Sequence, residues 1–354
     1  MIIYLLETEP EEEVYFRAEL PGHDLRFVGA AAEVGDDAEI VCGIATAALD
    51  ASFRAAHPRL RCIAVRGSGA NDMDLPDYAA HDIVVCAARS FADETAAEHT
   101  FALILALSRR LREVMEQPKE KRPFSYGAAR GMDLSGKTLG IIGLGLIGQR
   151  VAELAHAFRM RIVAFDPEGR PPDAAHVDAQ WLPLEELLAA SDIITLHTRL
   201  LPATRHLLNR NTLALCRRGV LIVNTARGSL IDTGALDEAL ESGQVGGAGL
   251  DVLEEERVLR ASASRIITAE IVERLQTDPA PTSSDAPHAT PEPGRVTGLH
   301  QLMLSDSLLA RKNVVFTPTV AFQSVEAAAR LNIATVENIR AFIAGEPLAP
   351  AHGE

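Results

Sequence analysis

The segment Lys137–Asp166 constrains the fold of this chain more than any other stretch of its sequence. It reads KTLGIIGLGLIGQRVAELAHAFRMRIVAFD. A short apolar run ends at Gly143, apolar residues at helical spacing follow Gly148, and a second apolar run ends at Asp166. This order predicts a strand, a glycine-rich turn, a helix and a second parallel strand, which together form a βαβ unit.

The glycines of this unit have separate physical roles in a dinucleotide-binding turn. Gly143 permits the tight turn, Gly145 lets the backbone approach a pyrophosphate, and Gly148 lets the helix pack closely on the strand. The free N–H groups of the helix N-terminus, at Leu146 and Ile147, would then face the phosphates. The pattern therefore predicts a cofactor site at this turn.

Asp166 indicates which cofactor the turn would bind. A carboxylate here would accept hydrogen bonds from the adenosine ribose, and its charge would repel a 2′-phosphate. We therefore predict NAD as the cofactor, in preference to NADP. The alternative is a glycine-rich turn of another α/β protein, but strand, turn, helix, strand and acid occur in register, which favours the dinucleotide site.

Length and composition limit the remaining possibilities. The 354 residues are enough for two domains, and the net charge of −15 argues against a nucleic-acid or membrane partner. The apolar run at the N-terminus is far shorter than the ~20 residues of a spanning helix, so we expect a first strand there. The four cysteines form no CxxC pair, which indicates reduced core residues of a cytoplasmic protein and no metal site.

Strands and helices are expected to alternate in the first part of the chain, which favours a parallel, doubly wound sheet. A glycine-rich turn, Arg66–Gly69, follows the fourth expected strand. Its amides could hold a carboxylate, although an ordinary strand-to-helix turn fits equally well. The expected strands are Ile2–Leu6, Leu25–Val28, Glu39–Cys42, Cys62–Val65 and Ile83–Cys86, with helices near Glu11–Leu20 and Leu49–Ala56.

A long helix is expected over Asp93–Arg112, and its apolar centre predicts burial between two layers or domains. His99 in its first half could be an acid or a base, but a hydrogen-bonded interface histidine is the more common case. The polar segment Glu116–Asp133 is a candidate domain junction.

Three further apolar runs, Ile193–Leu196, Val220–Val223 and Gly247–Val252, continue the α/β rhythm after Asp166. Ligands of open α/β sheets bind beyond the carboxyl ends of the strands, so the tails of these runs should line the site. A helix is expected between the last two runs, with Asp232 as its N-cap. The tails are His197–Arg199, Asn224–Gly228 and Asp251–Glu256.

These motifs together resemble the D-isomer-specific 2-hydroxyacid dehydrogenases, from about Arg61 to the end of the chain. The resemblance implies two doubly wound parallel-sheet α/β domains and a homodimer. A flavodoxin-like substrate domain would comprise residues 1–108 and 324–354, and a Rossmann NAD-binding domain would comprise 109–323. The motifs are GLGLIG with Asp166, NTARGSLID (Asn224–Asp232), GLDVLEEE (Gly249–Glu256) and TPTVAF (Thr317–Phe322).

The same resemblance implies site residues for hydride transfer between NAD and a small 2-hydroxy or 2-oxo acid. Arg227 would grip the carboxylate and carbonyl oxygen of the substrate, as a planar fork does well. Glu256 would pair with a catalytic histidine and raise its pKa. Other positions implied are Gly67, Ser68 and Gly69 for the substrate carboxylate, and His197, Thr225, Ala226 and Asp251 for the cofactor.

Thr319 stands where the family carries its catalytic histidine. Threonine does not exchange a proton near neutral pH, and removing a positioned acid or base costs ~10²- to 10⁴-fold in rate. Phe91 replaces a tyrosine of many relatives, and Asn71-Asp72 inverts their usual pair. Arg199 replaces a proline and could pair with the pyrophosphate or Asp166, or crowd the adenosine side.

Residues 257–311 form an apparent insertion, with a helix expected near Ala269–Leu275 followed by a Pro-, Ser- and Thr-rich part that we expect to be disordered. It could fold over the cleft as a lid. His288 or His300 within it could replace the missing donor, as could Glu256 acting through a water.

Two functions therefore remain open. The first is a working NAD-dependent oxidoreductase for a small D-2-hydroxy acid, with an unusual proton path. The second is a non-catalytic NAD(H)-binding sensor or interaction protein of the same fold.

Overall fold

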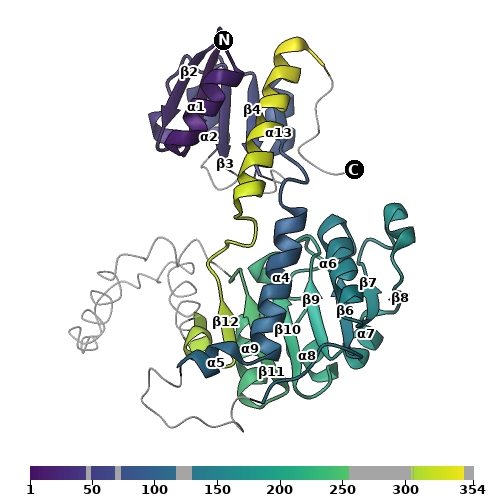
Figure 1. The fold of residues 1–354 in the computed structure, drawn as a ribbon. Helices are drawn as coiled ribbons and strands as arrows, with labels where there is room; N and C mark the ends of the chain where they lie inside the picture. Colours follow the sequence, from purple (N-terminus) through teal and green to yellow (C-terminus); the bar gives the residue numbers. More distant parts are fainter. Residues whose placement is uncertain (45–48, 68–72, 117–129, 255–303, 306, 347–354) are drawn as a thin grey trace, which may run out of the picture. The chain divides into compact units, whose positions relative to one another are not determined.

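A computed structural model describes residues 1–44, 49–67, 73–116, 130–254, 304–305 and 307–346 of the chain (Figure 1). The chain divides into two compact units. Unit 1 comprises Met1–Thr95 and Phe322–Glu354, and unit 2 comprises Ala96–Ala321. Each unit contains one parallel sheet.

Unit 1 contains a five-stranded sheet in the order β2-β1-β3-β4-β5, and every neighbouring pair is parallel. This is the strand order of the flavodoxin-like doubly wound fold, so the predicted fold class of this unit is confirmed. The strands are β1 (Ile2–Leu6), β2 (Asp24–Val28), β3 (Ile40–Ile44), β4 (Cys62–Arg66) and β5 (Val84–Ala87).

Helices cover both faces of this sheet, as the unbroken apolar runs of its strands require. Phe16 of α1 (Pro10–Glu19) and Ile339 of α13 (Val325–Ala344) pack on one face. Tyr78 of α3 (Leu75–Ala80) and Phe53 of α2 (Ala51–Ala56) pack on the other. A short 3-10 turn, η1, spans Ala31–Glu33.

Local chemistry explains both ends of α13. The Ser324 side chain accepts a hydrogen bond from Ala327 N at 3.0 Å, which caps the first turn. Gly345 ends the helix in the left-handed region, at a φ of 72°.

Unit 2 contains a seven-stranded sheet in the order β12-β11-β10-β9-β6-β7-β8. Counted within the unit, this is the Rossmann order extended by one strand, which confirms the predicted Rossmann domain. The strand order reverses between β6 and β9. The strands are β6 (Thr138–Ile142), β7 (Arg161–Phe165), β8 (Gln180–Trp181), β9 (Ile193–Leu196), β10 (Val220–Asn224), β11 (Val245–Leu250) and β12 (Val314–Phe316).

The helices of unit 2 also form two layers. The helices α4 (Asp93–Ser108) and α6 (Leu146–Ala157) pack on one face of the sheet, where the rings of Phe101 and Phe158 stack at 5.2 Å. The helices α7 (Leu184–Ala190), α8 (Arg210–Leu215) and α9 (Thr233–Glu241) pack on the other. Two 3-10 turns, η2 (Pro172–His176) and η3 (Gly228–Leu230), complete the unit.

Most of α4 belongs to unit 2, whereas the sequence placed the domain boundary at residue 108. The boundary differs because the apolar face of α4 packs on the sheet of unit 2. Leu103 and Leu107 lie so close to β11 that an added Cβ on Gly249 would be 3.0 Å from Leu103. The unit boundary consequently lies between Thr95 and Ala96, within the first turn of the helix.

The expected helix Asp93–Arg112 is shorter in the structure and ends at Ser108. Arg110 adopts a left-handed conformation with a φ of 53°, and Met132 N donates to Ser108 O at 2.8 Å. The carbonyl that would continue the helix is thus bonded to a distant segment. A separate helix, α5 (Leu111–Glu116), follows.

The C-terminal part of the apparent insertion is packed on the core of unit 2. Leu308 is buried in the cluster that α9 and β11 share, and Arg311 Nε lies 2.5 Å from Asp237 Oδ1. The last residues of the predicted insertion therefore belong to the core of unit 2. Residues 255–303 lie outside the described residues, and with them Glu256, the expected helix Ala269–Leu275, His288, His300 and the lid.

Three further observations bear on the expectations from composition. None of the helices in the described ranges combines the length and the apolar character needed to cross a membrane. The four cysteines are buried and unpaired with one another. Within those ranges, no three His, Cys, Asp or Glu side chains are grouped so that they could hold a metal ion.

Candidate functional site

Gly143 brings together the two strand ends at which the order of the unit 2 sheet reverses. Its φ is 92°, and an added Cβ would lie 2.5 Å from Thr198 N and 2.6 Å from the carbonyl carbon of His197. Any other residue would therefore be strained in its backbone and would clash with the segment after β9. This is the position at which ligands of open α/β sheets bind.

The N-terminus of α6 begins beside this turn and has room in front of it. Gly145 is the N-cap and makes no side-chain capping bond, and an added Cβ there would meet no described atom within 4 Å. Gly148 is the opposite case, because its Cβ would lie 2.2 Å from Gly143 O. Leu146 is exposed and Ile147 is partly buried against the core. The N-terminus of α6 thus has no side-chain cap and has free space beside Gly145, which leaves room for an anion.

The Asp166 carboxylate lies at the end of β7 and fixes the glycine turn. Its Oδ2 accepts from Leu144 N at 2.9 Å, and its Oδ1 accepts from Glu168 N at 3.0 Å. Arg199 pairs with Glu168, at 2.5 and 3.1 Å, rather than with Asp166 as the sequence analysis considered. Both partners of that pair are about half exposed, so it contributes little to stability.

His197 follows β9 and has a polar atom without a partner. Its backbone N–H donates to Ile142 O at 2.7 Å, whereas its Nε2 is shielded and makes no hydrogen bond among the described residues. Burial lowers the pKa of the imidazole to about 3, so the ring is neutral near neutral pH. An unpaired ring nitrogen beside the glycine turn fits a ligand with a hydrogen-bonding group, as a dinucleotide has.

The loop after β10 presents Arg227. Asn224 is buried and holds the loop, because its Oδ1 accepts from Ala226 N at 3.0 Å and its Nδ2 donates to Arg227 O at 2.9 Å. Thr225 Oγ1 lies 3.0 Å from Thr100 Oγ1 on α4. The Arg227 guanidinium is exposed and bonds the carbonyl of Ala226 at 2.8 Å. An exposed guanidinium on a fixed loop can bind a carboxylate.

Asp251 organises the turn that follows β12. It is 1% exposed, and its carboxylate accepts from Thr317 Oγ1 at 2.6 Å, from Val320 N at 2.9 Å and from Ala321 N at 2.9 Å. Its carbonyl accepts from Thr319 N at 2.7 Å. Asp251 was predicted to lie near the cofactor, but its hydrogen bonds to the turn after β12 were not predicted. The reason is that β11 and β12 become neighbours only in the fold.

Thr319 has an unusual backbone conformation. Its φ of 51° lies in the left-handed region, which is uncommon for a residue branched at Cβ. Strained residues of this kind persist only where the surroundings hold them, and they cluster at functional sites. The bonds from Asp251 and Thr317 O supply that constraint.

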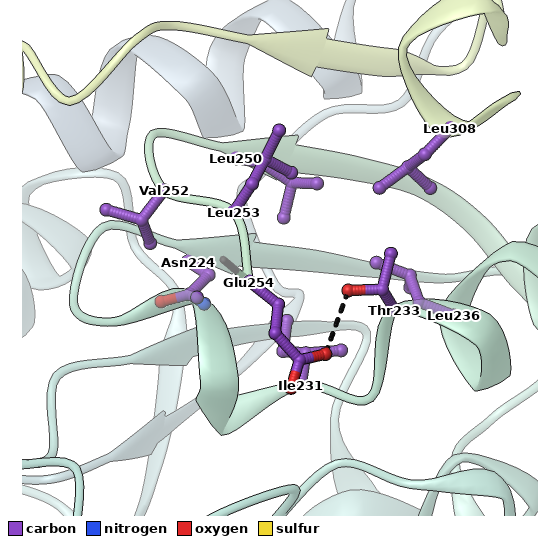
Figure 2. A pocket seen from close by; sticks show the side chains of 10 residues that line it. Asn224, Ile231, Thr233, Leu236, Leu250, Val252, Leu253, Glu254 and Leu308 are labelled. Atoms are coloured by element: carbon purple, nitrogen blue, oxygen red, sulfur yellow. Dashed lines mark hydrogen bonds between the residues drawn. The ribbon is translucent and has the colours of Figure 1, made fainter. Parts of the chain in front are cut away.

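Residues of α9, of the end of β11 and of the segment after β11 line a pocket, as Figure 2 shows, and Glu254 is its charged residue. The buried Glu254 carboxylate accepts from Thr233 Oγ1 at 3.2 Å and contacts His206 Nε2 at 2.6 Å and Arg205 Nη2 at 3.2 Å. The sequence analysis expected Glu254 to line the site as part of a strand tail. These contacts connect the segment after β11 to α9 and to the loop before α8.

Unit 1 contains the other predicted residues. Gly67 is buried at the end of β4, and its N–H donates to Val65 O at 3.0 Å. Ser68, Gly69, Asn71 and Asp72 lie outside the described residues. Phe91 is 7% exposed and belongs to a small apolar cluster. The centre of its ring lies 6.3 Å from that of the Phe322 ring. Its ring therefore packs within unit 1.

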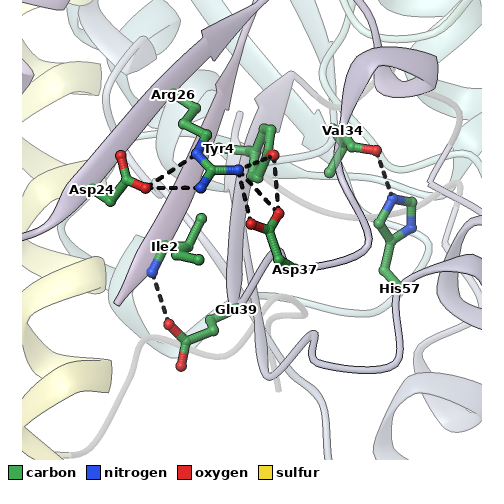
Figure 3. Close-up of polar contacts among 8 residues, drawn as sticks. All are labelled: Ile2, Tyr4, Asp24, Arg26, Val34, Asp37, Glu39 and His57. Atoms are coloured by element: carbon green, nitrogen blue, oxygen red, sulfur yellow. Dashed lines mark hydrogen bonds and ion pairs between the residues drawn. The ribbon is translucent and has the colours of Figure 1, made fainter.

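A cluster of charged groups around Arg26 in unit 1 is held by mutual contacts, as Figure 3 shows. Arg26 Nη1 bonds Tyr4 OH at 2.7 Å and Asp37 Oδ2 at 2.9 Å, and its Nη2 bonds Asp24 at 2.9 Å. The buried His57 ring bonds Val34 O at 3.1 Å. These groups stabilise the sheet edge and offer no second candidate site.

Residues 101–321 match the protein family described as "D-isomer specific 2-hydroxyacid dehydrogenase, NAD binding domain". This range covers nearly all of unit 2. The glycine turn, the open α6 N-terminus and the unpaired nitrogen of His197 fit the NAD that this description names.

Individual relatives agree with this match. Human D-3-phosphoglycerate dehydrogenase is 41% identical over 198 residues, which are 56% of this chain and 37% of the human protein. The Bacillus subtilis D-3-phosphoglycerate dehydrogenase is 41% identical over 197 residues, again 56% and 37% of the two chains. The matches thus span little more than a third of these relatives.

Solved structures extend the likeness to nearly the whole chain. The D-lactate dehydrogenase of Aquifex aeolicus, complexed with NAD and lactic acid, superposes with a TM-score of 0.79 and 28% identity. The superposition covers 97% of this chain and 96% of that one. With unit 2 matching the family from α4 to the turn after β12, this chain belongs to the D-isomer-specific 2-hydroxyacid dehydrogenases and carries their NAD-binding domain.

Proposed function

We propose that this chain is an NAD-dependent oxidoreductase that acts on the CH–OH group of a small D-2-hydroxy acid or reduces the corresponding 2-oxo acid. One observation supports this function above the others. The dinucleotide turn and the exposed Arg227 lie on the same edge of one sheet, at the carboxyl ends of β6 and β10. A cofactor site and a carboxylate anchor are therefore both offered by unit 2.

Different residues of unit 2 bind the cofactor and the substrate. The N–H groups at Leu146 and Ile147 bind the pyrophosphate, and Asp166 binds the adenosine ribose. Arg227 binds the substrate carboxylate and carbonyl oxygen through its planar fork. Bound NAD supplies the acceptor or donor of the hydride.

Further roles belong to the same proposal. Unit 1 is the substrate domain, in which the backbone of Gly67, Ser68 and Gly69 binds the substrate carboxylate and Phe91 shapes the pocket. Cofactor contacts are completed by His197, Arg199, Thr225, Ala226 and Asp251, with Gly143, Gly145 and Gly148 forming the turn. Glu256 matches the carboxylate that pairs with the catalytic histidine of the family, and Thr319 stands where that histidine does.

We propose that the protein is a cytoplasmic homodimer without nucleic-acid or membrane partners. The four free, buried cysteines support a reducing compartment. The net charge of −15 supports the absence of polyanionic partners. The homodimer rests on resemblance to the family.

The decisive experiment is an assay of the purified protein with NADH and a panel of 2-oxo acids. We expect turnover of at least one acid, and we expect Thr319→His to change kcat little, because another group then moves the proton. Absent turnover in the natural protein, with restoration in Thr319→His, would instead support a non-catalytic NAD(H)-binding sensor. The replacement of the family histidine by Thr319 is the observation that keeps this second function in view.

Asp166 is expected to make the protein select NADH over NADPH. Its carboxylate, fixed by Leu144 N and Glu168 N, would repel a 2′-phosphate. Fluorescence titration of the free protein should give a Kd for NADPH at least ~10-fold higher than for NADH, a difference of about 1.4 kcal/mol. Asp166→Asn should narrow that ratio. Equal affinities in the natural protein would contradict the prediction.

A further inference from the structure

His99 of α4 contacts the turn that Asp251 organises. Its Nε2 lies 2.9 Å from Thr317 Oγ1 and 3.5 Å from Asp251 Oδ1. The next residue, Thr100, contacts Thr225 in the loop that presents Arg227. His99 therefore lies within unit 2 between the strained turn of Thr319 and the loop of the substrate anchor.

The hydrogen bonds determine which nitrogen of His99 holds the proton. An ionised carboxylate can only accept, so the Thr317 hydroxyl must donate to Asp251 Oδ1, at 2.6 Å. Thr317 Oγ1 then has only lone pairs to offer His99, and His99 Nε2–H must donate to it. In the neutral ring, Nδ1 is left with a free lone pair.

The Nδ1 atom is available for chemistry. No hydrogen bond to it is present among the described residues, and the His99 side chain is 21% exposed. The Asp251 carboxylate lies on the Nε2 side of the ring, 3.5 Å from that nitrogen, so it does not cover Nδ1. A base oriented by an acid through a hydrogen bond is the arrangement that general-base catalysis requires.

We propose that His99 is the catalytic acid and base of this protein, in place of a histidine at position 319. This inference rests on the proposed function. In the oxidation direction His99 Nδ1 would take the O–H proton of the substrate. The C2–H hydrogen would leave with its electron pair as hydride while the C2=O bond forms, and bound NAD would supply the hydride acceptor. In the reduction direction the imidazolium returns the proton to the oxygen. Asp251 and Thr317 are positioning residues, because they act through His99.

The first test is kinetic. We expect His99→Gln to lower kcat by ~10²-fold or more, as removal of a general base does, and to leave the Kd for NADH unchanged. Thr317→Val should lower kcat because Nε2 loses its acceptor, whereas Thr317→Ser keeps the hydroxyl and should retain activity. His156→Gln, on the exposed end of α6, is the matched histidine control.

The second test does not depend on turnover. The ¹⁵N chemical shifts of the His99 ring in the free protein should show the proton on Nε2, and Thr317→Val should abolish that preference. An Nδ1–H tautomer, or full activity of His99→Gln in a protein that turns over, overturns the assignment of His99 and leaves the proposed function intact. If the natural protein turns over none of the 2-oxo acids, the proposed function is overturned, and the catalytic role of His99 is overturned with it.

Discussion

Replacing Arg227 by lysine is expected to lower kcat/KM for the best 2-oxo acid by ~10²-fold, which corresponds to about 2.7 kcal/mol of transition-state stabilisation. The reason is geometric. Asn224 fixes the loop, so the guanidinium can present two parallel N–H groups to a carboxylate and its neighbouring oxygen, whereas an ammonium offers one point charge. Steady-state kinetics with NADH held in excess provide the measurement.

The matched control is Arg210→Lys, since Arg210 of α8 is exposed and pairs with Glu238 of α9. It should leave kcat/KM and the Kd for NADH unchanged. Arg227→Lys should also leave the Kd for NADH unchanged, because Arg227 is assigned to the substrate. Equal kcat/KM for Arg227→Lys and the natural protein would remove Arg227 from the proposed site.

The substitution Gly228→Ala should destabilise unit 2 by about 3 kcal/mol or more. An added Cβ would lie 2.0 Å from Leu253 O, 2.1 Å from Leu253 C and 2.4 Å from Glu254 N, and all three are backbone atoms that cannot rotate away. The loop of Arg227 and the segment after β11 must then separate. Thermal and urea unfolding, followed by circular dichroism, measure the loss.

Gly234→Ala is also a glycine-to-alanine substitution, but we expect it to cause no loss of stability. Gly234 lies in α9, and its added Cβ would have no contact closer than 3.5 Å, from Asp232 Oδ1. Alanine is the better helix former, so the variant should be unchanged or more stable by about 0.5 kcal/mol. If both variants lost equal stability, the close approach of Gly228 to Leu253 would not be the cause.

The sheets were predictable from sequence because buried parallel strands are continuous apolar runs that stand out between polar segments. Runs such as Ile2–Leu6 and Ile193–Leu196 have the same bounds in the structure. The end of α4 was not predictable, since it depends on Met132 bonding Ser108 O from a distant part of the chain. The packing of Leu308 was missed for the same reason, because it is a tertiary contact made by the last residues of the predicted insertion.

Some features of the candidate site could likewise be predicted from the sequence, and others could not. The glycine turn with Asp166 was predictable, because each residue acts through its own backbone or charge. The partner of Arg199 is Glu168, and the sequence analysis considered only the pyrophosphate and Asp166. His99 was expected to be hydrogen-bonded, and it is. Its partners Thr317 and Asp251 directly follow β12 and β11, and no sequence pattern connects them to α4.

Unit 1 is built from both ends of the chain, and this has a consequence for biosynthesis. A ribosome delivers the N-terminus first, so β1 to β5 emerge long before α13, whose Val336 and Ile339 complete the cluster around Ile3 and Leu5. All of unit 2 is translated in the interval. One apolar face of the nascent unit 1 sheet therefore stays incompletely covered until α13 is synthesised. We expect unit 1, whose strands are synthesised first, to need chaperone protection more than unit 2 does.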